Sequence, residues 1–142
     1  EAVSKESLRK SPPVKRIERR CNTDGYKLGG VPLRRGHLVE IPTYAVLHCP
    51  DYYPNPERFD PNRFMPENKD HLVPYTYLPF GAGPRNCIGM RFAMQEIKLC
   101  LAKIVQQFRF ALPVGAARKL EFQKFSIGSA LPFYLDVSKR DG

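Results

Sequence analysis

Ten residues, Phe80-Gly81-Ala82-Gly83-Pro84-Arg85-Asn86-Cys87-Ile88-Gly89, decide how this chain is interpreted. Their glycines allow tight turns and the close approach of a flat ligand, and Pro84 stiffens the loop. A long amphipathic pattern follows at once. Cys87 is therefore predicted at the start of a helix, where unpaired N–H groups favour a thiolate. Arg85 adds a positive charge two residues away. The stretch predicts a loop that presents one reactive sulfur atom.

The residues alone leave three interpretations of Cys87 open. A single thiolate without nearby Cys or His partners is a poor zinc or iron–sulfur site, but it suits haem, because the porphyrin supplies the in-plane ligands. A lone cysteine is also commonly a small buried apolar residue. A glycine-rich loop before a helix can bind phosphate. However, Asn86 stands where the dinucleotide pattern requires glycine, and no Gly-Lys-Ser/Thr follows.

The pattern Phe80-x-x-Gly83-x-Arg85-x-Cys87-x-Gly89 resembles the haem-binding signature of the cytochrome P450 monooxygenases at every fixed position. The run from Tyr77 to Ala93 resembles the vertebrate microsomal branch that contains subfamily 3A and thromboxane synthase. The resemblance implies haem b (iron protoporphyrin IX) as the cofactor, with Cys87 as its iron ligand and the catalytic residue. The further cofactor-binding residues that it implies are Phe80 beside the sulfur, Arg85 and Arg19 at the haem propionates, Gly89 and Ala93.

Glu6 and Arg9 lie three residues apart in a predicted N-terminal helix, so their side chains share one helical face. Taken alone, such a pair is a surface ion pair worth ~0–1 kcal/mol. Followed by Pro12-Pro13, Glu6-x-x-Arg9 also resembles the Glu-x-x-Arg helix of the same family. The resemblance implies a buried structural triad of Glu6, Arg9 and Arg63, which pins the meander around Pro61-Asn62-Arg63-Phe64 under the cysteine loop.

Length and composition set the remaining limits. The 142 residues could form one small domain, but the chain begins at Glu1, inside a predicted helix, so we expect residues 1–142 to be a partial cytochrome P450 domain without its upstream portion. No apolar run approaches the ~20 residues of a membrane span, and no signal-peptide pattern is present. The spacing of the four cysteines indicates no disulfide framework, which favours a reducing compartment.

The net charge of +9 calls for an acidic partner or a solvated basic surface. The basic residues are scattered, and no nucleic-acid module is recognisable, so we expect no nucleic-acid partner. In the family resembled, the face near the thiolate receives an acidic flavoprotein. Arg91, Lys98 and Lys103 are therefore expected to contribute to a docking patch for NADPH–cytochrome P450 reductase, with cytochrome b5 as a further candidate donor.

The order of predicted elements is α+β, and it resembles the C-terminal portion of the cytochrome P450 fold: Glu-x-x-Arg helix, small sheet, meander, cysteine loop, long helix and C-terminal hairpins. Patterns and breakers predict helices at 1–10 and 88–108 and strands at 14–20, 26–28, 37–41, 108–110 and 133–137, with 26–28 and 37–41 in one small sheet. Residues 42–47 resemble the helix that follows this sheet. Residues 54–79 are predicted as an ordered loop, because their aromatic side chains supply apolar surface to bury.

Two details of the C-terminal half complete the fold prediction. A stripe at helical spacing predicts a face of the long helix that packs into a core; its members are Ile97, Leu101, Ile104, Val105 and Phe108. Gly128 predicts a turn, residues 126–131 resemble the tip of a substrate-contacting hairpin, and residues 138–142 resemble the subfamily 3A tail.

The function that the resemblance implies is a haem-thiolate monooxygenase of lipophilic substrates such as steroids and xenobiotics, driven by electrons from NADPH. It also implies the cytosolic face of the endoplasmic reticulum membrane, reached through an upstream anchor. The isolated chain is expected neither to oxidise substrate nor to hold haem tightly. Alternatives are an isomerase resembling thromboxane synthase, a haem sensor, or an inactive truncated chain with no haem role.

Overall fold

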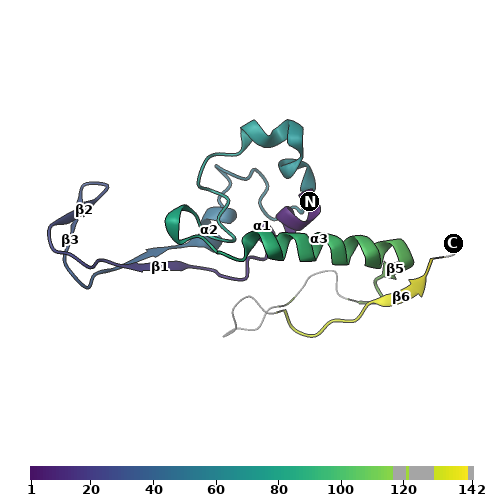
Figure 1. The fold of residues 1–142 in the computed structure, drawn as a ribbon. Helices are drawn as coiled ribbons and strands as arrows, with labels where there is room; N and C mark the ends of the chain where they lie inside the picture. The colour runs from purple at the N-terminus through teal and green to yellow at the C-terminus, as the bar shows by residue number, and fades with distance from the viewer. Residues whose placement is uncertain (117–120, 122–129, 141–142) are drawn as a thin grey trace.

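The computed structural model of the chain describes residues 1–116, 121 and 130–140. Its longest element is helix α3 (Met90–Gln107), which runs across the molecule in Figure 1. Helix α1 (Ala2–Lys10) and the loop-rich segment that follows α2 (Thr43–Leu47) gather beside the first half of α3. Two narrow strand ribbons extend away at one end, and a third lies at the other end of α3. Mixed helices and small antiparallel sheets confirm the predicted α+β class.

The small core lies between α1, α2 and the meander. Helix α1 ends at Lys10, two residues before Pro12-Pro13, which cannot continue a helix. Residues 54–79 are ordered as predicted and contain two short 3-10 helices, η1 (Pro61–Phe64) and η2 (Pro66–His71). The core cluster consists of Leu47, Tyr53 and Phe64, with Ala2, Leu72 and Tyr77 packed against it.

The strand pairing differs from the prediction. Strand β1 (Ile17–Arg20) pairs antiparallel with β4 (Leu38–Ile41), so that Ile17 faces Ile41. Strand β2 (Tyr26–Leu28) pairs instead with β3 (Val31–Leu33). The expectation that 26–28 and 37–41 belong to one sheet is therefore wrong. The sequence did not predict strand β3, which contains Pro32. A proline cannot donate a ladder hydrogen bond, but it is tolerated on an edge strand, and both strands of this two-stranded ribbon are edges.

The C-terminal strands form the third ribbon. Strand β5 (Phe108–Ala111) follows α3 directly and pairs antiparallel with β6 (Asp136–Lys139). The second strand begins three residues later than the predicted start at 133. The predicted turn at Gly128 lies outside the described residues, as do most of the predicted hairpin tip at 126–131 and the last two residues of the predicted tail.

The prediction that the apolar stripe of α3 packs into a core is wrong for this structure. Leu101 is 43% exposed and Val105 is 46% exposed, and no residue of α3 is buried. Among the described residues, α1 lies beside the first half of α3 and β5 contacts the helix that it follows, which leaves Leu101 and Val105 uncovered. Helical spacing identifies an apolar face, but it does not supply the partner that covers the face. Within the described residues, no helix has both the length and the apolar character needed to cross a membrane.

Candidate functional site

The loop before α3 is a tight turn. Gly81 and Gly83 have φ angles of +74° and +76°, which residues with a Cβ rarely adopt. Residues Gly83–Arg85 form the 3-10 helix η3, and the Asn86 amide donates to the Gly83 carbonyl oxygen over 3.1 Å. The Cys87 amide donates to the Phe80 carbonyl oxygen over 2.9 Å, which closes the loop on itself. The backbone therefore holds Phe80 and Cys87 at the two ends of one turn.

Cys87 precedes the helix rather than starting it. Helix α3 begins at Met90, and the Cys87 carbonyl accepts a 3.3 Å hydrogen bond from the Met90 amide. The predicted position at the helix start is therefore corrected by three residues, because Ile88 and Gly89 form a turn before α3. The Cys87 side chain is exposed and carries a free thiol. Exposure rules out the interpretation of Cys87 as a small buried apolar residue in this structure.

A pocket of about 360 Å³ brings four of the predicted cofactor-binding residues together. Cys87, Phe80 and Arg85 come from the loop, and Arg19 comes from β1, more than sixty positions earlier in the chain. The rest of the lining is apolar or backbone: Pro13, Val14, Ile17, Leu78, Pro79 and Gly81. The pocket therefore combines one sulfur ligand, two cations and an apolar wall.

The two arginines of the pocket are exposed. The Arg19 Nη1 group donates to the Glu18 carbonyl oxygen over 2.7 Å. No hydrogen bond or ion pair within the described part of the chain engages Arg85. Both guanidiniums thus keep donors available for an anion, and a guanidinium binds a carboxylate through two parallel hydrogen bonds.

Gly89 and Ala93 lie behind the loop. A Cβ atom added to Gly89 would lie 3.9 Å from the Cys87 sulfur, so the glycine leaves the immediate neighbourhood of the sulfur open. The Ala93 amide donates to the Gly89 carbonyl oxygen over 2.9 Å in the first turn of α3. Neither residue lines the pocket that contains Cys87. The structure therefore places Gly89 beside the sulfur and leaves Ala93 outside the pocket.

The structure also brings Glu6, Arg9 and Arg63 together. Arg9 and Glu6 are both 0% exposed, and two parallel hydrogen bonds of 2.7 and 2.9 Å join them. The Arg63 Nε atom lies 3.8 Å from the Glu6 Oε1 atom. Its Nη2 group donates to the Pro54 carbonyl oxygen over 2.6 Å.

Backbone groups complete this buried charge cluster. Arg9 donates to the carbonyl oxygens of Leu47, over 2.9 Å, and Pro56, over 2.8 Å. Glu6 accepts from the Asp60 amide over 2.9 Å. One pair of ionised side chains therefore ties α1 to the end of α2 and to the meander. The Arg63 Nε atom is buried without a hydrogen-bond partner among the described residues, so Arg63 meets Glu6 through the 3.8 Å ion pair and not through a hydrogen bond.

Sequence reasoning gave no role to two tyrosines that support this cluster. The Arg9 guanidinium carbon lies 5.4 Å from the ring centre of Tyr53, a buried cation–π contact. The Tyr77 hydroxyl donates to the Lys5 carbonyl oxygen over 3.1 Å. Burial raises the pKa of both hydroxyl groups above the ordinary tyrosine value. The aromatic residues of 52–77 signalled buried surface, but nothing in their spacing named their partners.

Comparisons with known proteins decide the family. The sequence model of the family described as "Cytochrome P450" matches residues 1–134. The chain belongs to the cytochrome P450 family. Cytochrome P450 3A2 of Rattus norvegicus is 52% identical over 108 residues, which cover 76% of this chain and 21% of that protein. Cytochrome P450 3A16 of Mus musculus is 42% identical over 145 residues, which cover 98% of this chain and 28% of that protein. This confirms the resemblance to subfamily 3A.

An insect relative matches equally well. Cytochrome P450 9e2 of Blattella germanica is 52% identical over 109 residues, covering 75% of this chain and 20% of that protein. This P450 chain therefore spans about a fifth of the length of several curated relatives that it matches.

The described residues fit the haem that the family implies. A haem-thiolate site needs a cysteine sulfur as the iron ligand and an apolar environment for the flat ring, and guanidinium groups are suited to bind the two haem carboxylates. The Cys87 pocket supplies an exposed thiol, an apolar lining and two available guanidiniums. No group of three or more potential metal ligands of the His, Cys, Asp or Glu type occurs among the described residues.

Proposed function

We propose that this chain is the C-terminal haem-binding part of a longer cytochrome P450 monooxygenase, with Cys87 as the iron ligand. The observation that most directly supports this proposal is the pocket that Cys87 shares with Phe80, Arg19 and Arg85. The haem, when bound, supplies the oxygen-activating chemistry. The reaction is the insertion of one atom of O₂ into a lipophilic substrate such as a steroid or xenobiotic. This substrate class is the one that the resemblance to subfamily 3A implies.

Each pocket residue has a separate task in this proposal. Cys87 donates its sulfur as a thiolate, and the turn that joins its amide to Phe80 fixes the direction of approach. Arg19 and Arg85 bind the haem carboxylates. With haem bound, Phe80 and the apolar wall would shield the sulfur from water, which would strengthen the electrostatic interactions inside the pocket. Gly89 keeps the space beside the sulfur free of a side chain.

The Glu6–Arg9–Arg63 cluster serves this site as a scaffold. It holds the meander against α1, because Arg9 donates to the Pro56 carbonyl oxygen and Glu6 accepts from the Asp60 amide. Tyr77 packs against the core, and Leu78 follows it in the chain toward the cysteine loop. The cluster therefore positions the loop without touching the reacting atoms.

The electron donors in this proposal are NADPH–cytochrome P450 reductase and, as a second donor, cytochrome b5. Arg91, Lys98 and Lys103 are exposed along α3, which starts directly after the Cys87 loop. Lys98 also lies 3.5 Å from Glu1. A cationic surface along the helix that follows the Cys87 loop would attract an acidic flavoprotein and speed its association. The longer protein would act at the endoplasmic reticulum membrane, on its cytosolic face.

The test of the iron ligand is the reduced carbon-monoxide spectrum of the longer protein. Wild type is expected to show the thiolate-type band, and Cys87→Ser is expected to lose it. Cys100→Ser is the matched control, because Cys100 is also an exposed free thiol but lies on α3 outside the pocket. A thiolate band that survives in Cys87→Ser, or that disappears equally in Cys100→Ser, contradicts the assignment. Product analysis with NADPH and reductase then separates oxygen insertion from isomerisation.

A further inference from the structure

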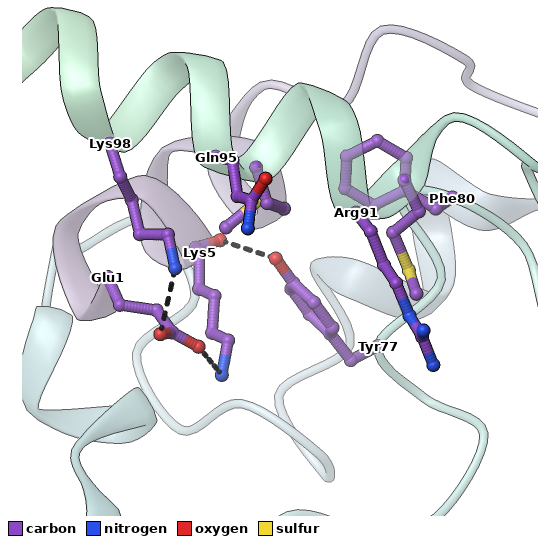
Figure 2. A pocket seen from close by; sticks show the side chains of 9 residues that line it. Glu1, Lys5, Tyr77, Phe80, Arg91, Gln95 and Lys98 are labelled. Carbon is purple, nitrogen blue, oxygen red and sulfur yellow. Dashed lines mark hydrogen bonds and ion pairs between the residues drawn. The ribbon is translucent and has the colours of Figure 1, made fainter.

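A second pocket, of about 340 Å³, lies between α1 and α3 and meets the cysteine loop at Phe80. Figure 2 shows its lining, with Tyr77 pointing from the loop side toward α1. The Tyr77 hydroxyl donates to the Lys5 carbonyl oxygen over 3.1 Å. Its ring packs on Phe64 of the core, with ring centres 4.8 Å apart. One side chain therefore contacts α1 and the core at the same time.

The Lys5 carbonyl is a firm attachment point. Lys5 precedes Glu6, whose carboxylate is fully buried and bonded to Arg9 and to the Asp60 amide. This turn of α1 is thus fixed to the meander by the buried charge cluster. A hydrogen bond to its backbone ties Tyr77 to the best-anchored part of the described fold.

A short route leads from Tyr77 to the sulfur ligand. Tyr77 stands three residues before Phe80, whose carbonyl oxygen accepts the Cys87 amide. Phe80 also lines both the α1–α3 pocket and the Cys87 pocket, so it contributes to the two sites at once. A shift of Tyr77 would move Phe80 and, through that hydrogen bond, the backbone of Cys87.

We propose that Tyr77 is a positioning residue for Cys87: its hydrogen bond to the Lys5 carbonyl fixes the start of the cysteine loop. This inference rests on the proposed function, since it assigns Tyr77 to the stability of the sulfur–iron bond. The hydroxyl stays protonated below strongly alkaline pH, because burial raises the pKa of Tyr77. It therefore remains a donor throughout the range in which the protein would work.

The decisive variant is Tyr77→Phe in the longer protein, which keeps the ring and its contact with Phe64. Tyr53→Phe is the matched control, because it also removes a buried hydroxyl, one that faces Thr76 instead of α1. In dilute urea, the thiolate-type band of Tyr77→Phe is expected to convert to the shorter-wavelength form about fivefold faster than in wild type. That factor corresponds to one hydrogen bond of about 1 kcal/mol. The Tyr53→Phe rate should stay near that of wild type.

Amide hydrogen exchange gives a second readout that does not depend on the spectrum. Peptides covering residues 80–89 of Tyr77→Phe are expected to exchange about fivefold faster than in wild type, by the same hydrogen-bond free energy. Peptides from α1 should be unchanged. In wild type alone, the Cys87 amide should exchange more slowly than the exposed turn at Gly115, so the inference stays testable if Tyr77→Phe fails to fold.

The outcomes separate the two proposals. If wild type shows no thiolate-type band, the proposed function fails, and this inference fails with it. If wild type shows the band but Tyr77→Phe matches either wild type or Tyr53→Phe in both measurements, only the role of Tyr77 is overturned. A Cys87 amide that exchanges as fast as the turn at Gly115 in wild type overturns that role as well.

Discussion

The Glu6–Arg9 cluster and the Cys87 pocket use charged side chains in opposite ways. In the cluster, both partners are fully buried, and the guanidinium of Arg9 is satisfied by Glu6 and backbone oxygens. In the pocket, Arg19, Arg85 and Cys87 are exposed and largely unengaged within the described residues. Buried charges must find their partners inside the fold, because an unpaired one costs several kcal/mol. Charges left available at an apolar pocket are suited to a ligand instead.

This contrast predicts unequal effects on the free energy of unfolding, and the largest is at Arg9. Arg9→Ala leaves the Glu6 carboxylate buried without its main partner, so we expect the free energy of unfolding to fall by about 3–5 kcal/mol. Urea unfolding of the 142-residue chain, followed by circular dichroism, measures this. Cys87→Ser is the control from the other region. Because its side chain is exposed, it should change the same quantity by no more than about 0.5 kcal/mol. Equal losses would remove the distinction between the regions.

A smaller effect is expected at Gly81. Its φ of +74° strains any residue with a Cβ, so Gly81→Ala should lower the free energy of unfolding by about 1–2 kcal/mol. Gly115→Ala is the matched control, since Gly115 has a φ of +79° and no atom within 4 Å of an added Cβ. Both variants should lose similar stability. Only Gly81→Ala should also weaken haem retention in the longer protein, measured by haem transfer to an acceptor globin. Equal retention in both would show that the loop backbone does not shape the site.

The smallest effect concerns alkaline pH. The pKa values of Tyr53 and Tyr77 are raised in the folded chain, so the folded state holds these protons more tightly than the unfolded state does. Their contribution to stability is fully present below the unfolded pKa of about 10 and is lost as pH rises toward the folded values. The range from about pH 8 to about pH 11 includes the ordinary pKa of tyrosine. The urea concentration at the midpoint of unfolding should therefore fall toward the alkaline end of this range. Tyr77→Phe should flatten that fall. If the midpoint of Tyr77→Phe falls with pH as steeply as that of wild type, a group other than Tyr77 causes the fall.

Local patterns predicted the helices and the loop well. Glu6-x-x-Arg9 before Pro12-Pro13 predicted α1 and its end, and the glycines around Pro84 predicted the turn that carries Cys87. The order of elements was also predictable, because caps, breakers and periodicity act within a few residues. The subfamily 3A resemblance rested on the same local runs and is confirmed by the family match.

Local patterns did not predict which strands pair or which distant residue completes each contact. The pairing of β2 with β3 depends on a hairpin that includes Pro32, and the β6 strand starts later than its pattern indicated. The prediction that the α3 stripe is buried was wrong for the same reason. Spacing along the chain says nothing about which distant segment supplies the other half of an interaction.

The sequence by itself determined the sulfur, the turn that presents it and the ion pair of α1, because each depends on residues close together in the chain. Only the tertiary structure decided that Arg19 joins Cys87 at one pocket, that Arg9 is satisfied by carbonyl groups near forty and fifty positions away, and that Tyr77 reaches the Lys5 carbonyl. The physical reason is that most buried polar atoms need a hydrogen-bond partner, and the fold alone determines which distant partner lies within reach.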